Sequence, residues 1–139
     1  MSPELDRELC VKFPDIMAER HLGAMQTAMC WGFEHDDGWF DILKTAMHLI
    51  QSRIEIQKRI GNEIDQVVFE QVKEKFGRLT IYYRGGDEYI HGVVAMAESM
   101  SAVTCETCGA PGHQRGGGWI HTFCDEHEAE RQEKFKERI

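Results

Sequence analysis

The sequence has no excess of positive charge and no long hydrophobic run. Its 139 residues include 16 Lys and Arg against 24 Asp and Glu, a formal net charge of -8, which argues against a protein that binds mainly by neutralising phosphates. No apolar stretch approaches the roughly 18 residues of a membrane span. The N-terminal MSPELDRELC is acidic, where a signal peptide is basic and then apolar. We therefore expect a cytoplasmic protein.

The cysteines do not form the even, regularly spaced set of a disulfide framework. There are five, and an odd number with CxxC spacing in an intracellular setting favours metal binding over disulfides. Cys10 and Cys30 are isolated among apolar residues, so we expect them to behave as small buried hydrophobic side chains. The other three lie together near the C-terminus.

The segment CETCGAPGHQRGGGWIHTFCDEH, residues 105–127, contains two pairs of metal-binding residue types. Cys105 and Cys108 form a CxxC knuckle, with Gly109 allowing the backbone to reverse. Cys124 and His127 form the second pair, at the start of a predicted helix. The fifteen residues between the pairs combine turn residues with the β-prone run WIHTF and predict a hairpin. The order of knuckle, hairpin and helix is that of a treble-clef zinc finger.

Three histidines compete for the fourth ligand position. His127 lies one helical turn after Cys124, so both donors can face the same point. His121 lies in the predicted strand, where an odd separation from Cys124 places the two side chains on opposite faces. His113 lies in a glycine-flanked turn and reaches the site only if the loop folds back. The predicted ligands of a zinc ion are therefore Cys105, Cys108, Cys124 and His127.

Four protein ligands close the coordination shell, whereas a catalytic zinc keeps a position open for water. We therefore expect a structural zinc that contributes folding free energy to this segment. No phosphate loop of the GxxxxGK type and no nucleophile-base pattern is present. A finger-derived nuclease would need a catalytic histidine and a second metal ligand, for which His121 and Glu130 are the candidates. The sequence favours a non-enzymatic protein without excluding an enzyme.

Apolar spacing elsewhere predicts an α+β fold: a small, mainly helical domain with a β-hairpin, followed by the finger. The strongest helix is residues 38–62, where a continuous apolar stripe runs from Trp39 to Ile60. Asp36 or Asp37 is the expected cap at its start, and Gly61-Asn62 ends it. The other expected elements are helices at 3–9, 14–21, 87–102 and 125–139 and a hairpin within 66–86 that turns at Gly77-Arg78. Asp87 is the expected cap of the helix at 87–102, and the charged helix at 125–139 is expected to face solvent. We predict a core domain at 1–103 and a zinc-finger module at 104–139.

The segment from Trp31 to Phe40 combines aromatic, acidic and glycine residues. Glu34, His35, Asp36 and Asp37 offer carboxylates beside an imidazole, which suits cation binding or acid-base chemistry. The favoured interpretation is simpler. Acidic residues are expected at a helix start because of the helix dipole, and the aromatic residues are expected to enter the core.

Three motifs occur in the order WGFEHDDGWFDIL, QVKEKFGRLTIYY and CETCG...GGGWIHTFCDEH. Together they resemble a family of small uncharacterised proteins of bacteriophages and prophage regions, over about residues 13–127. The family usually has cysteine directly after WGFE, where this chain has His35, so a thiol role there does not transfer. The resemblance implies a phage-type gene and a bacterial host cytoplasm, but no activity. A weaker likeness, to the short zinc-finger regulators that enter the secondary channel of bacterial RNA polymerase, suggests a type of partner only.

These observations lead us to expect an accessory or regulatory protein that binds a protein partner. The alternative is a nucleic-acid-binding module that uses Arg115 in the finger together with cations of the last helix. Glutamates alternate with those cations, so the helix presents charges of both signs and not a basic stripe. The helix cations are Lys134, Lys136 and Arg138.

Overall fold

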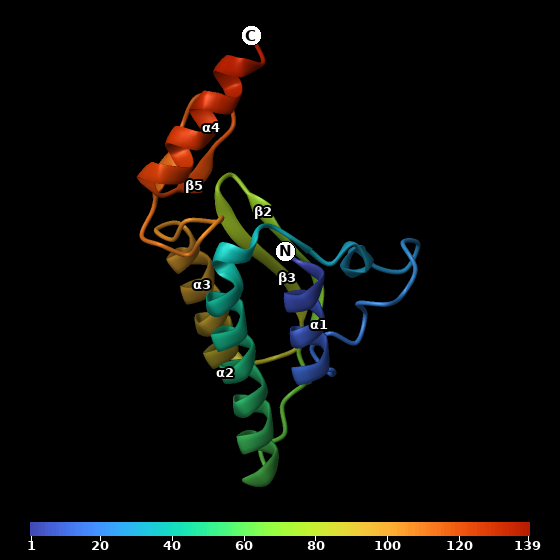
Figure 1. Cartoon of the computed structure of the whole chain (residues 1–139). Helices are drawn as coiled ribbons and strands as arrows, with labels where there is room; N and C mark the ends of the chain where they lie inside the picture. The colour runs from blue at the N-terminus through green and yellow to red at the C-terminus, as the bar shows by residue number, and fades with distance from the viewer.

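The computed structural model describes residues 1–139 and has the predicted α+β fold (Figure 1). The helices are α1 (Pro3–Lys12), α2 (Phe40–Arg59), α3 (Glu88–Ser101) and α4 (Asp125–Glu137), with 3₁₀ turns η1 (Ala28–Trp31) and η2 (Asp37–Trp39). The strands are β1 (Phe33–Glu34), β2 (Val68–Lys75), β3 (Arg78–Arg84), β4 (His113–Arg115) and β5 (His121–Phe123). No helix has the length and apolar character needed to cross a membrane.

Strands β1, β2 and β3 form one sheet in that order, with β1 parallel to β2 and β2 antiparallel to β3. The predicted hairpin is thus confirmed, but its turn is one residue earlier than expected. Lys75 pairs with Arg78, and the two residues between them, Phe76 and Gly77, both have positive φ, at 53° and 77°. Such a two-residue turn matches the right-handed twist of the flanking strands.

The apolar stripe of α2 is buried as predicted, and the helix ends where the sequence indicated. Its buried residues are Leu43, Ala46, Met47, Ile50, Ile54 and Gln57. Gly61, with a φ of 79°, donates to the Lys58 carbonyl, and Asn62 donates to the Gln57 carbonyl. This pair of hydrogen bonds is the Schellman pattern that closes a helix C-terminus.

Two expectations about the N-terminal part were wrong. Residues 14–21 form turns rather than a second helix, because the Ile16 carbonyl accepts a hydrogen bond from the Phe69 amide of β2. That carbonyl is therefore bonded to the sheet edge and not to a following helical turn.

Neither Asp36 nor Asp37 caps α2 through its side chain. The Asp37 carboxylate accepts a hydrogen bond from the Ser2 amide at 2.7 Å and ties α1 to the start of α2. By contrast, the predicted cap of α3 is confirmed, because the Asp87 carboxylate accepts from the Ile90 amide at 3.1 Å.

The hydrophobic core lies between the sheet and helices α1, α2 and α3. It comprises 18 buried residues, and none of them lies beyond Val94. In the C-terminal part, α4 exposes nearly all its side chains, as predicted, and buries only Glu128. The finger at 104–139 therefore needs stabilisation from outside the core. The division into 1–103 and 104–139 remains a prediction.

Candidate metal centre

The knuckle is a tight turn between Cys105 and Cys108. Gly109, with a φ of 81°, donates to the Cys105 carbonyl at 2.9 Å, and the Cys105 amide donates to the Ala110 carbonyl at 2.7 Å. These bonds fix both thiols on the same side of the turn. Cys105 is fully buried, whereas Cys108 is exposed.

The second pair stands where the β4–β5 hairpin passes into α4. Strands β4 and β5 pair antiparallel, with His113 opposite Phe123, which confirms the predicted hairpin. Cys124 is the N-cap residue of α4 and His127 lies in the first turn. This placement turns both side chains toward the knuckle, completing the treble-clef-like order of knuckle, hairpin and helix.

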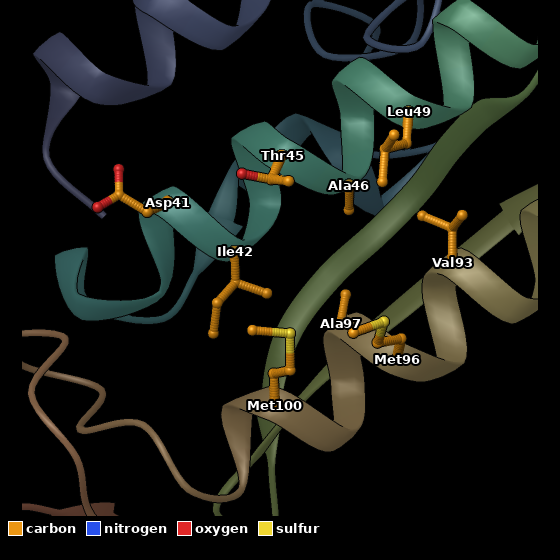
Figure 2. A pocket seen from close by; sticks show the side chains of 9 residues that line it. All are labelled: Asp41, Ile42, Thr45, Ala46, Leu49, Val93, Met96, Ala97 and Met100. Carbon is orange, nitrogen blue, oxygen red and sulfur yellow. The ribbon is translucent and has the colours of Figure 1, made fainter.

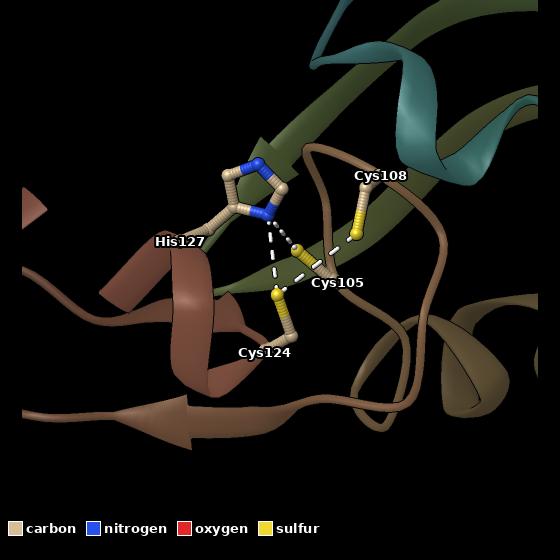
Figure 3. Close-up of side chains that lie close together, drawn as sticks. All are labelled: Cys105, Cys108, Cys124 and His127. Atoms are coloured by element: carbon tan, nitrogen blue, oxygen red, sulfur yellow. Dashed lines mark hydrogen bonds between the residues drawn. The ribbon is translucent and has the colours of Figure 1, made fainter. Parts of the chain in front are cut away.

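The structure brings the four predicted ligands into one cluster (Figure 3). Their donor atoms all lie within 4.8 Å of one another. The Cys105 and Cys124 sulfurs are 3.5 Å and 3.1 Å from Nδ1 of His127, and the Cys108 and Cys124 sulfurs are 3.9 Å apart. Three thiols and one imidazole are thus arranged so that they can hold a metal ion.

The competing histidines lie outside this cluster. The His121 ring stacks on Phe123 at 5.1 Å and on Trp119 at 6.4 Å, on the strand face opposite the buried Thr122. His113 is exposed on β4. Neither belongs to the group of converging donors, in agreement with the alternation argument.

The surroundings of Cys105 lower the pKa of its thiol. Burial by itself raises its pKa, but hydrogen bonds from backbone amides, those of Cys124, Cys108 and Thr107, outweigh burial and bring the pKa down to about 6. Cysteine binds metals as the thiolate. The backbone of the knuckle therefore favours the form that a metal ion requires.

Three hydrogen bonds join the finger to the segment at the start of α2 and to the tip of the β2–β3 hairpin. The Gly38 amide donates to the Glu106 carbonyl at 2.7 Å, and the Trp39 indole donates to the Thr104 carbonyl at 2.9 Å. On the other side, the Thr122 hydroxyl donates to the Gly77 carbonyl at the tip of the β2–β3 hairpin. A Cβ on Gly38 would lie 2.1 Å from the Cys105 carbonyl oxygen, so only glycine fits there.

The segment from Trp31 to Phe40 contributes mainly to the hydrophobic core. Trp39 and Phe33 are buried, whereas Trp31 is exposed. His35 is buried too: its Nδ1 bonds to the Asp36 carbonyl at 2.7 Å and its Nε2 has no partner. Glu34 is exposed and accepts a bond from Gln71. These residues do not form a second metal-binding group.

His35 predicts a pH dependence of stability. Burial lowers its pKa from 6.5 to about 4, so the unfolded chain binds the proton more tightly than the folded one. The contribution of neutral His35 to the free energy of unfolding is fully present above pH 6.5. It is lost as the pH falls toward 4, and the loss amounts to roughly 3 kcal/mol at most. Denaturant titrations should show that the wild type loses stability relative to His35→Phe as the pH falls across this range. A difference between the two proteins that does not change with pH would contradict the assignment.

The sequence did not reveal two surface features. One is a groove between α2 and α3, whose α2 residues, except Ala46, fall outside the buried stripe of that helix. The other is Phe76, which lies in the turn because the turn is one residue earlier than predicted. Arg115, the finger residue named for the nucleic-acid-binding alternative, donates to the Phe123 carbonyl and, at 2.7 Å, to the Asp125 carboxylate.

Comparison with known proteins identifies no relative: no family model, no curated protein and no solved structure matches the chain.

Proposed function

We propose that this chain is a non-enzymatic, zinc-stabilised accessory or regulatory protein that binds a protein partner. A phage-type gene and a bacterial cytoplasm belong to the proposal and rest on the sequence resemblance alone. The observation that carries the proposal is the convergence of Cys105, Cys108, Cys124 and His127, because four protein donors leave no position for a reacting water.

Zinc fits the donor set and its dimensions. Three thiolates and an imidazole are a common structural zinc set, and tetrahedral Zn–S and Zn–N bonds of about 2.3 and 2.0 Å imply donor separations of roughly 3.5–3.8 Å. Two of the observed separations, 3.5 and 3.9 Å, fall near this range. The third, between the Cys124 sulfur and Nδ1 of His127, is shorter at 3.1 Å, and all donor pairs lie within 4.8 Å.

The partner surface that we propose is the α2–α3 groove, a cavity of about 360 Å³. Figure 2 shows Ile42 facing Met100, and Leu49 facing Val93, across the space between the helices. Met96 is 65% exposed although apolar, and Leu49 and Met100 are also exposed. The lining residues are Asp41, Ile42, Thr45, Ala46, Leu49, Val93, Met96, Ala97 and Met100.

The occupant that suits this groove is an amphipathic helix of another protein. Apolar grooves between helices bind such helices through side chains spaced three and four residues apart, and flexible methionines adapt to their shape. Asp41 is the only charged lining residue and forms no salt bridge. A basic residue at one end of the partner helix would complement it.

Met96→Glu tests the groove, with Val11→Glu as the matched control, since Val11 is exposed on α1. A protein retained from bacterial lysate by the wild type and by Val11→Glu, but not by Met96→Glu, is the expected result. Equal retention by all three would contradict the groove assignment. A concentration-dependent dimer that Met96→Glu abolishes would identify a second copy as the occupant and contradict a separate protein partner.

A further inference from the structure

Two large aromatic side chains with no role in the core line one cleft. Phe76, at the turn of the β2–β3 hairpin, is 71% exposed, and Trp119, in the loop before β5, is 68% exposed. The cavity that they line has a volume of about 340 Å³, and we call it the tip cleft. Its lining residues are Glu74, Lys75, Phe76, Gly118, Trp119 and Ile120.

Phe76 is unfavourable for folding at this position. It is the only residue other than glycine with a positive φ, a conformation that costs an ordinary side chain about 1 kcal/mol or more. Asparagine or glycine is the usual choice in such a turn. Because the ring is mostly exposed, its burial does not offset this cost. Contact with another molecule therefore accounts for a phenylalanine at this position better than a role in folding does.

The Trp119 side chain is held in place by stacking on neighbouring rings. Its ring stacks on His121 and the His121 ring stacks on Phe123, with interplanar angles of 22° and 13°. The hairpin tip and the finger are also in direct contact, because a Cβ on Gly77 would lie 3.0 Å from Ile120. The two exposed rings are therefore carried by elements that hold each other in place.

Cations adjoin the rings. Lys75 Nζ lies 6.0 Å from the centre of the Phe76 ring and 3.5 Å from the Tyr82 hydroxyl, and Lys73 Nζ lies 5.9 Å from the centre of the Tyr82 ring. Neither lysine forms a salt bridge, and neither does Arg78. The carboxylate of Glu74, between the two lysines in the sequence, accepts a hydrogen bond from the Gly77 amide.

The charge at the tip of this hairpin is opposite to that of the whole chain. Residues 73–78 contain three Lys and Arg and one Glu, whereas the chain carries -8. The cationic part of the surface therefore coincides with the exposed rings of Phe76 and Tyr82. This coincidence favours an anionic ligand with flat, stackable groups.

We propose that the tip cleft binds single-stranded nucleic acid, with a base stacked against Phe76 or Trp119 and phosphates near Lys75 and Lys73. Aromatic rings beside cations are how proteins bind single strands without reading their sequence. The acidic remainder of the chain predicts weak, salt-sensitive binding. This inference is independent of the α2–α3 groove, which shares no residue with the tip cleft.

Fluorescence anisotropy with a labelled single-stranded oligothymidine and a labelled oligouridine, at about 50 and about 200 mM salt, tests the inference. Phe76→Asn removes the ring while suiting the turn, so it should fold at least as well as the wild type. We expect Phe76→Asn and Trp119→Ala each to weaken binding roughly tenfold. Lys75→Gln should reduce the slope of log affinity against log salt by about 0.7.

The matched controls are Phe135→Ala and Trp31→Ala, two exposed aromatic residues outside the tip cleft, which should leave binding unchanged. Absence of binding to both strands at the lower salt concentration would overturn the inference. So would binding that Phe76→Asn and Trp119→Ala leave intact. Equally tight binding of polyglutamate, lost in the same two variants, would assign the cleft to an acidic protein and also overturn it.

Discussion

Replacement of His127 by alanine, or removal of the metal with a chelator, is expected to unfold residues 104–139 while the rest of the chain stays folded. The reason is that none of the 18 core residues lies beyond Val94. Metal binding contributes on the order of 10 kcal/mol to the folding of isolated zinc fingers. Without it, a few hydrogen bonds to the rest of the chain and the short β4–β5 hairpin are not enough to order the finger.

Amide hydrogen exchange measures this directly, because it reports the opening of each segment separately. We expect protection to disappear in β5 and at the start of α4 and to persist in β2 and α2. His121→Ala is the matched control: it also removes a histidine from the finger, but from the aromatic stack rather than the ligand cluster. Protection in the finger that survives both chelation and His127→Ala would contradict a structural role for the metal.

Trp39→Ala is expected to destabilise the core by about 3–5 kcal/mol, the usual cost of removing a buried tryptophan. The side chain has no exposed surface, and its indole bond to the Thr104 carbonyl links the core to the finger. Trp39→Phe keeps most of the apolar volume and loses this bond, so a smaller loss of about 1–3 kcal/mol is expected.

Trp31→Ala is the control for both variants, because Trp31 is 66% exposed and only eight positions away. Its expected effect on the free energy of unfolding is within about 0.5 kcal/mol. Denaturant titration of the four proteins gives the comparison. Equal destabilisation by Trp31→Ala and Trp39→Ala would contradict the separation of this segment into a core tryptophan and a surface tryptophan.

The convergence of the four candidate metal ligands could be predicted because each pair is positioned by local backbone geometry. A CxxC turn, a helical CxxH and a hairpin between them each fix neighbouring side chains through backbone geometry alone. The stripe of α2, the Asp87 cap and the β2–β3 hairpin were predictable for the same reason.

The errors fall where distant contacts decide the local structure. Residues 14–21 have helical spacing, but the Ile16 carbonyl bonds to Phe69 on β2. Asp37 is a good capping residue by type, yet it binds the Ser2 amide of α1. Both partners are far away in the sequence, so no local pattern indicates them.

The two proposed binding surfaces were hidden for a different reason. Ile42 and Leu49 are spaced as a second helical face beside the buried stripe of α2, a weak signal that packing against α3 turns into a groove. Phe76 is ordinary in a strand and unusual in a turn with positive φ. Its position became informative only once the hairpin register was known.

The central claim is that Cys105, Cys108, Cys124 and His127 hold one structural zinc ion. Metal analysis of the purified protein by mass spectrometry tests it most directly. The expected result is one zinc per chain in the wild type, in Cys10→Ser and in His121→Ala, and loss of stoichiometric zinc in Cys105→Ser and His127→Ala. Zinc stoichiometry that survives both Cys105→Ser and His127→Ala would contradict the assignment.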